Sequence, residues 1–142
     1  MTQEEKQLLL KDLCARLPYG VKVHINSSIE EQNQMTLYDV NLESETIGVK
    51  NEQWAFRAIP IVDREDNAKI VKPYLRSLST MTEEEDKDWQ FYKCRVAESC
   101  DELLEQRIAE LHDWFNAHHF DYYGLIEKGL ALEAPEGMHK TE

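Results

Sequence analysis

Residues 113–126, DWFNAHHFDYYGLI, form the stretch around which the rest of the chain is organised. These fourteen residues hold five of the thirteen aromatic side chains of the protein, two of its five histidines and two aspartates. A long amphipathic pattern runs into the stretch, so a helix must end there and the chain must turn. We therefore predict that its aromatic side chains anchor a core at the end of the last long helix.

The residues that precede this stretch predict a helical hairpin. The later helix starts at residues 99–102, SCDE, and its apolar residues recur at i, i+4, i+7 and i+11. They are Leu104, Ile108, Leu111 and Phe115. Two capping boxes are available to the earlier helix, Thr80 with Glu83 and Thr82 with Glu85. The apolar face of the earlier helix would consist of Trp89, Tyr92 and Val96.

The N-terminal half predicts a helix followed by five short strands. Thr2 and Glu5 form a capping box, and the helix ends before Pro18, because a residue that precedes proline is pushed out of the α region. Alternation of apolar and polar residues predicts strands at residues 21–26, 35–42, 46–50, 54–59 and 69–76. Residues 27–34 read as a polar loop and residues 63–67 as a charged turn. Pro60 and Pro73 favour a strand end or a sheet edge.

These elements predict a single α+β domain over residues 1–134. It would contain an N-terminal helix, a small five-stranded antiparallel sheet or SH3-like or Sm-like partial barrel, and the C-terminal helical hairpin. The length of 142 residues agrees with one domain. After the hairpin, residues 123–128 predict one more turn, which Gly129 ends as a C-cap. Residues 135–142 predict a frayed tail.

The net charge of −12 restricts the partners of the protein. A protein that binds nucleic acid in general needs a basic surface, and so does one that docks on anionic lipids. Direct nucleic-acid or membrane binding is therefore disfavoured. Most of the imbalance lies in residues 82–113, which hold eleven acidic and four basic residues. A helical surface of that charge is typical of a solvated face, and its alternative interpretation is an acidic inhibitor that mimics nucleic acid.

Cysteine usage and the N-terminal sequence favour a cytoplasmic protein. The three cysteines lie at positions that match no zinc or redox motif, and they predict reduced, buried thiols that behave as small hydrophobes. They are Cys14, Cys94 and Cys100. Residues 1–6 lack the basic flank and apolar segment of a signal peptide. No apolar run approaches the ~18 residues that a membrane span requires.

The best candidate for a metal site, judged by composition, lies at the corner formed by residues 112–121. It contains His112, Asp113, His118, His119 and Asp121. Imidazole and carboxylate groups suit zinc or iron. Their spacing is poor, because two ligands on one helical face need an i, i+3 or i, i+4 separation. We therefore predict no metal or cofactor here, and expect a histidine to cap the helix C-terminus and Asp121 to cap the next turn.

Other candidate chemistry is weaker. No nucleophile elbow and no phosphate-binding loop is present, and the carboxylates of residues 83–86 are typical of a solvated helix start. One local basic strip surrounds an aromatic residue, a pattern that can contact a nucleic-acid backbone. It consists of Lys69, Lys72 and Arg76 around Tyr74. In a chain of net charge −12, a solubilised strand edge is the favoured interpretation.

Three segments together resemble a family of small uncharacterised proteins from gut anaerobic bacteria, which often lie in prophage or mobile-element neighbourhoods. The segments are residues 17–21 (LPYGV), residues 71–79 with 81–85 (VKPYLRSLS and MTEEE), and residues 114–131 (WFNAHHFDYYGLIEKGLA). The resemblance implies a bacterial or phage cytoplasmic protein. It implies no activity and no catalytic residue. It also implies an arginine at the position where this chain has Tyr123.

We therefore predict a non-enzymatic interaction or accessory module of a bacterial prophage or mobile element. The first alternative is the nucleic-acid mimic built on residues 82–113. The second is a metal-assisted enzyme that uses the corner at residues 112–121. An interaction module needs an exposed apolar surface, a mimic needs one continuous acidic face, and an enzyme needs the corner side chains within a few Å of each other.

Overall fold

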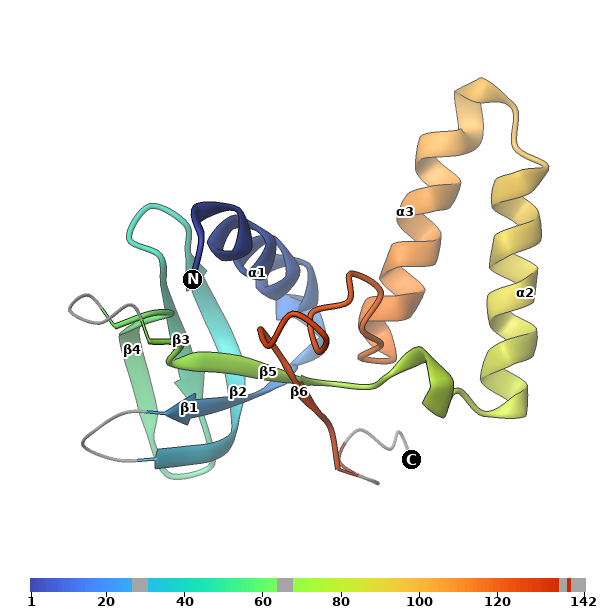
Figure 1. The fold of residues 1–142 in the computed structure, drawn as a ribbon. Coiled ribbons are helices and arrows are strands. Elements are labelled where there is room, and N and C mark those ends of the chain that lie inside the picture. Colours follow the sequence, from blue (N-terminus) through green and yellow to red (C-terminus); the bar gives the residue numbers. More distant parts are fainter. Residues whose placement is uncertain (27–30, 64–67, 136–137, 139–142) are drawn as a thin grey trace.

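The computed structural model, shown in Figure 1, describes residues 1–26, 31–63, 68–135 and 138, and only the backbone of residues 31–34. The fold is α+β, with an N-terminal helix, a mixed six-stranded sheet and two C-terminal helices. None of the helices in the described ranges is long and apolar enough to cross a membrane.

Helix α1 (Gln3–Arg16) begins and ends where the sequence predicts. The side chain of Thr2 accepts a hydrogen bond from the amide of Glu5, and the carboxylate of Glu5 accepts one from the amide of Thr2. The 3-10 helix η1 (Leu17–Tyr19) follows, with Gly20 in the left-handed region at its end. Leu9 and Leu13 are fully buried and join the core of the sheet, so α1 covers one sheet face.

Six strands form one sheet in the order β4-β3-β2-β1-β5-β6. Their bounds are β1 (Lys22–Asn26), β2 (Glu31–Asn41), β3 (Thr46–Lys50), β4 (Ala55–Pro60), β5 (Val71–Leu75) and β6 (Leu132–Glu133). The pairs from β4 to β5 are antiparallel, and β6 pairs with β5 in parallel. Pro60 ends the edge strand β4 as predicted. Pro73 lies beside the two residues of β5 that pair with β6.

The sheet differs from the prediction at two places. The expected five-stranded antiparallel sheet is wrong in strand number, because Leu132 and Glu133 add a parallel strand too short to show alternation in sequence. The loop predicted over residues 27–34 is wrong for residues 31–34, which begin β2. These polar residues are part of the strand because their backbone pairs with β1, and their sequence has no apolar alternation that would predict a strand. Residues 27–30, residues 64–67 of the predicted turn and most of the predicted tail lie outside the described residues.

The helical hairpin consists of α2 (Glu83–Ala97) and α3 (Asp101–Ala117), preceded by the short 3-10 helix η2 (Leu78–Thr80). Of the two possible capping boxes, α2 uses Thr82 with Glu85. The N-cap of α3 is Cys100, whose side chain makes no capping hydrogen bond. In Figure 1 the two helices lie side by side and project from the sheet, with only their base against the rest of the fold.

Two hydrophobic clusters meet at the stretch 113–126. Trp114, Phe115 and Phe120 are buried in the cluster at the base of the hairpin. Leu125 is fully buried in the other cluster, between α1 and the sheet. The prediction that this stretch anchors a core is confirmed, and the stretch joins two cores rather than one. At its end, residues 125–129 form turns, and Gly129 has the positive φ of 72° that a C-cap requires.

Candidate functional site

The polar side chains of the predicted corner are used in local structure. His118 Nδ1 lies 3.0 Å from the carbonyl oxygen of Trp114, so this histidine caps the C-terminus of α3. The carboxylate of Asp121 accepts hydrogen bonds from the amides of Leu125 and Ile126, at 2.8 and 3.0 Å. Both capping predictions are therefore confirmed.

The corner does not assemble a metal site within the described residues. His112 stacks on Tyr122, with ring centroids 5.0 Å apart, rather than facing His118. His119 adopts a left-handed backbone with φ of 61°, and its carbonyl oxygen accepts a hydrogen bond from the amide of Arg76. No three His, Cys, Asp or Glu side chains in the described part of the chain lie where they could share a cation. The corner thus gives the hypothesis of a metal-assisted enzyme no geometric support.

The three cysteines are separate free thiols. Cys14 is partly buried in α1, but the prediction of buried thiols is wrong for Cys94 and Cys100, which are exposed where the hairpin projects away from the sheet. Burial raises the pKa of the Cys14 thiol, which disfavours the thiolate that a nucleophile requires.

The predicted basic strip is divided by the fold. Arg76 turns to Glu85 in α2, and its guanidinium also lies 4.2 Å from the centroid of the Phe120 ring. Tyr74 packs edge-on against His24 of β1. Arg76 therefore joins the hairpin to the sheet, and the strip does not present three free cations.

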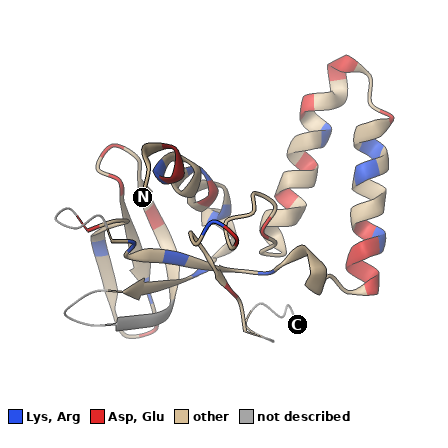
Figure 2. Cartoon of the chain, viewed as in Figure 1, with Lys and Arg blue, Asp and Glu red and all other residues tan. Residues whose placement is uncertain are grey.

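The acidic residues of the hairpin gather in separate places. Figure 2 shows acidic residues in the first turn of α2 and others around the α2–α3 turn and along α3, with basic residues between the first two groups. The first turn of α2 holds residues 83–86, and the α2–α3 turn is flanked by Glu98 and Asp101. Two of the acids, Glu85 and Glu110, are paired with arginines. The nucleic-acid mimic remains a prediction, and this division of charge does not favour it.

An open groove crosses the exposed face of α3 near the base of the hairpin, and it is the strongest candidate for a binding site. Its volume is about 490 Å³, within the range of ligand-binding pockets. Its lining residues come from η1, α2 and α3: Tyr19, Phe91, Tyr92, Arg95, Glu110, Asp113, Trp114 and Ala117. Four of these eight are aromatic, and three are charged.

One side of the groove is an aromatic wall shared by the two helices. The ring of Tyr92 lies between those of Phe91 and Trp114, with centroid separations of 5.5 and 6.0 Å. Trp114 is only 8% exposed and belongs to the core, whereas Phe91 is 57% exposed. Phe91 is therefore held in place by its neighbours while most of its side chain faces solvent.

An arginine lies against this wall. The Arg95 guanidinium carbon is 5.5 Å from the centroid of the Phe91 ring, and a guanidinium nitrogen is 3.4 Å from a carboxylate oxygen of Glu110. The backbone carbonyl of Arg95 accepts a hydrogen bond from Arg107 at 3.0 Å, which ties α2 to α3 at this level. The wall thus already stabilises a positive charge on its aromatic surface.

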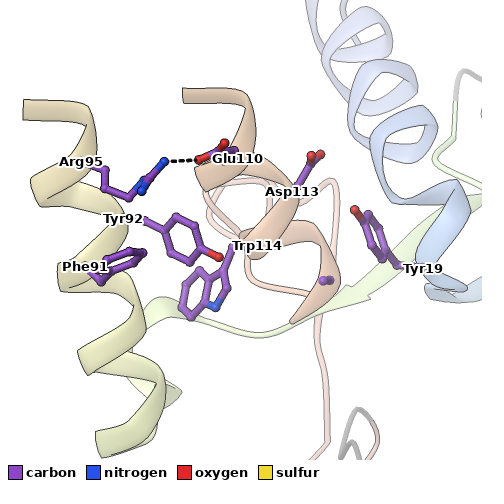
Figure 3. A pocket seen from close by; sticks show the side chains of 8 residues that line it. Tyr19, Phe91, Tyr92, Arg95, Glu110, Asp113 and Trp114 are labelled. Carbon is purple, nitrogen blue, oxygen red and sulfur yellow. Dashed lines mark hydrogen bonds and ion pairs between the residues drawn. The ribbon is translucent and has the colours of Figure 1, made fainter. Parts of the chain in front are cut away.

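Tyr19 forms the opposite side of the groove, as Figure 3 shows. Burial raises the pKa of its hydroxyl, and the negative charge of Asp113 raises it further. Asp113 is exposed, and no hydrogen bond or ion pair joins it to another residue in the ranges that the structure describes. The groove therefore contains one carboxylate held by Arg95 and one carboxylate open to a ligand.

Sequence reasoning did not identify this groove. It placed Tyr92 and Trp114 on core faces, which is correct, but it passed over Phe91. A signal for Phe91 existed, because this aromatic residue lies off the Trp89–Tyr92–Val96 face of a strongly acidic helix. Tyr19 carried no signal, because it reaches the groove only through the packing of η1 near α3.

Comparison of the chain with family models, curated proteins and solved structures finds no match in any of the three.

Proposed function

We propose that the protein is a non-enzymatic interaction module that holds a segment of a partner protein in the groove between Tyr19 and the base of the hairpin. The observation that carries this proposal is the exposed ring of Phe91, fixed between Tyr92 and Arg95 in a groove of about 490 Å³. Aromatic residues and arginine are the side chains most enriched at the energetic centres of interfaces. The free carboxylate of Asp113 adds a polar contact that fixes orientation.

The setting that we propose is the cytoplasm of a bacterium, with the gene in a prophage or mobile element. The resemblance of residues 17–21, 71–85 and 114–131 to proteins of gut anaerobic bacteria supports this setting. The first of these segments contains Tyr19, and the last contains Trp114 and Ala117 of the groove.

We further propose that β1 to β5 form an SH3-like or Sm-like partial barrel. Two observations support this. The chain runs through neighbouring antiparallel strands from β1 to β4 and then returns β5 to the free side of β1. The segments that leave β4 and enter β5 also meet, because the amide of Ile70 donates a hydrogen bond to the carbonyl of Ile61. Curvature of this kind would leave the groove on the outside of the barrel.

Selection from a random dodecapeptide phage library tests the proposed site. Peptides that bind the intact protein should lose at least tenfold in affinity when Phe91→Ser removes the aromatic ring from the groove. The matched control is Leu103→Ser, since Leu103 is an exposed apolar residue of α3 that does not line the groove. If every selected peptide binds the two variants equally, or if no peptide is selected, the proposed function is wrong.

A further inference from the structure

We infer that the groove recognises a cationic side chain, a lysine ammonium or an arginine guanidinium of the partner protein, seated between Tyr19 and the aromatic wall and beside Asp113. This inference rests on the proposed function and specifies the chemistry of its ligand.

Half of the residues that line the groove are aromatic. The face of an aromatic ring carries negative electrostatic potential, so a cation within about 6 Å of a ring centroid is attracted. Tyr19 lies on one side and Tyr92 with Trp114 on the other, so a side chain that enters the groove meets rings from both directions. Two of the three rings, those of Tyr19 and Tyr92, carry hydroxyls. The groove is open to solvent, so the charged end of a bound side chain keeps part of its hydration.

Cations already occupy aromatic faces of this hairpin. Arg95 lies over Phe91 at 5.5 Å, and Lys93 lies over Trp89 at 4.3 Å on the same helix. Arg95 also has a carboxylate partner in Glu110. Arg95 is therefore one cation of the groove that is bound by both an aromatic ring and a carboxylate.

The second such combination has no cation. Asp113 lies one helical turn beyond Glu110 on α3, and Figure 3 shows its carboxylate on the side of α3 that faces Tyr19. No residue in the described ranges supplies the positive partner to Asp113. A lysine or arginine that enters from solvent would complete an arrangement equivalent to that of Arg95, Phe91 and Glu110.

Charge excludes the opposite ligand chemistries. An anionic side chain would face Asp113 and the acidic hairpin, whose residues 82–113 have eleven acids against four bases. A purely apolar side chain would cover Asp113 without giving it a partner, and an unpaired carboxylate is costly to desolvate. A net charge of −12 also steers basic segments toward the protein over long range.

The test uses the peptides selected on the intact protein, with binding measured by fluorescence anisotropy at physiological salt. Each lysine is replaced by norleucine and each arginine by citrulline, which keeps the side-chain length and removes the charge. One position should lose roughly tenfold in affinity, the size expected for a partly desolvated cation over aromatic rings. Asp113→Asn should weaken the charged peptide by a similar factor and leave the norleucine or citrulline peptide nearly unchanged.

Two controls separate local recognition from general attraction. Glu105→Gln removes the same charge from an exposed site of α3 outside the groove, and it should weaken the charged peptide less than twofold. Tyr19→Leu keeps the apolar volume and removes the ring, so it should discriminate against the charged peptide in the same way as Asp113→Asn.

The outcomes distinguish the two proposals. If Phe91→Ser abolishes binding but no charged position in any peptide matters by more than twofold, the groove binds a partner through apolar side chains and the cation inference is wrong. If Asp113→Asn and Glu105→Gln weaken binding equally, the attraction is diffuse and the inference is also wrong. If Phe91→Ser has no effect, the proposed function itself is wrong.

Discussion

Both terminal nitrogens of the Arg76 guanidinium lie 2.7 Å from a carboxylate oxygen of Glu85. This paired contact joins the end of β5 to the first turn of α2, and the same guanidinium lies over the ring of Phe120. Arg76 therefore contacts the sheet, the start of the hairpin and the turn that follows it. The orientation of the groove depends on this junction, because both helices of the groove leave the body of the protein here.

Acid should protonate the exposed carboxylates first and should break this junction only at lower pH. Hydrogen bonds from Arg76, and from Thr82 in the capping box, hold the pKa of Glu85 at about 2, below its usual 4.5, although partial burial raises it. The stabilisation is therefore complete above pH 4.5 and is lost as pH falls through 2. It amounts to roughly 3 kcal/mol. Urea unfolding of the intact protein and of Glu85→Gln between pH 7 and 2.5 measures it.

Glu84→Gln is the control for this experiment, because Glu84 is an exposed residue of the same turn. The stability of Glu84→Gln should follow that of the intact protein at each pH. If Glu85→Gln loses the same stability at pH 7 as at pH 2.5, the pair does not act through its charge.

Removal of one member of the buried pair in α1 should be severe. Arg16 Nε donates to Asp12 Oδ2 at 2.8 Å, and both side chains are fully buried. Each single change, Asp12→Leu or Arg16→Met, should cost about 3–5 kcal/mol, because it leaves a buried charge without its partner. The double variant should cost clearly less than the sum of the two, since it leaves no charge. A double-mutant cycle from urea unfolding decides this, and additive losses would contradict it.

Aromatic packing at the corner should matter more than its histidine. Trp114→Ala or Phe115→Ala should destabilise the protein by about 3–5 kcal/mol, because both rings are buried. His118→Ala removes one capping contact and a partly exposed ring, so it should cost about 1 kcal/mol, the usual net value of a hydrogen bond. Thermal and urea unfolding measure the ranking. The reverse ranking would show that the corner is not an anchor of the core.

Asp121 should hold the turn that follows the corner. Its carboxylate accepts hydrogen bonds from Leu125 and Ile126, so Asp121→Ala should cost about 1–2 kcal/mol. Asp121→Asn, which keeps one acceptor oxygen, should recover part of the loss. Glu127→Ala is the control on an exposed residue of the same turn. Hydrogen exchange of the amides of Leu125 and Ile126 should accelerate in Asp121→Ala, and unchanged exchange would contradict the capping role.

Phe91 should be dispensable for folding. Its side chain is 57% exposed and packs on the surface of the hairpin, so Phe91→Ser should change the free energy of unfolding by no more than about 0.5 kcal/mol. The comparison is Trp89→Ser, which should cost more, because the Trp89 ring packs in the core cluster with its centroid 6.4 Å from that of Phe115. Equal losses for Phe91→Ser and Trp89→Ser would place Phe91 in the core and remove it from the groove.

Much of the fold follows from short-range patterns in the sequence. The capping boxes at Thr2 and Thr82 mark both helix starts, because the signals and the contacts lie within four residues. The alternation at residues 21–26 marks a strand with one buried face, whereas residues 46–50 form a strand that is buried on both faces. Strand β6 escapes such reasoning, because two residues carry no period. The two capping residues of the corner, His118 and Asp121, were predictable for the same reason as the helix starts.

The groove was not predictable in this way. Its walls join Tyr19 to Phe91 and Asp113, which only tertiary packing brings together. Amphipathic spacing assigns a residue to an inner or outer face, but it does not say which outer residues border a hollow. Arg76 shows the same limit, because its sequence neighbours suggested a basic strip and its actual partner, Glu85, depends on where α2 begins.

The contact between Arg16 and Phe120 has a consequence for how the chain is made. The guanidinium of Arg16 donates a hydrogen bond to the Phe120 carbonyl across 104 residues, and it lies fully buried in the finished protein. At a translation rate of ~5 to 20 residues per second, the acceptor leaves the ribosome roughly 5 to 20 s after the donor. During that interval the first helix has been made, but the segment that covers Arg16 has not. The burial of Arg16 is therefore completed only after the segment that contains Phe120 has been made.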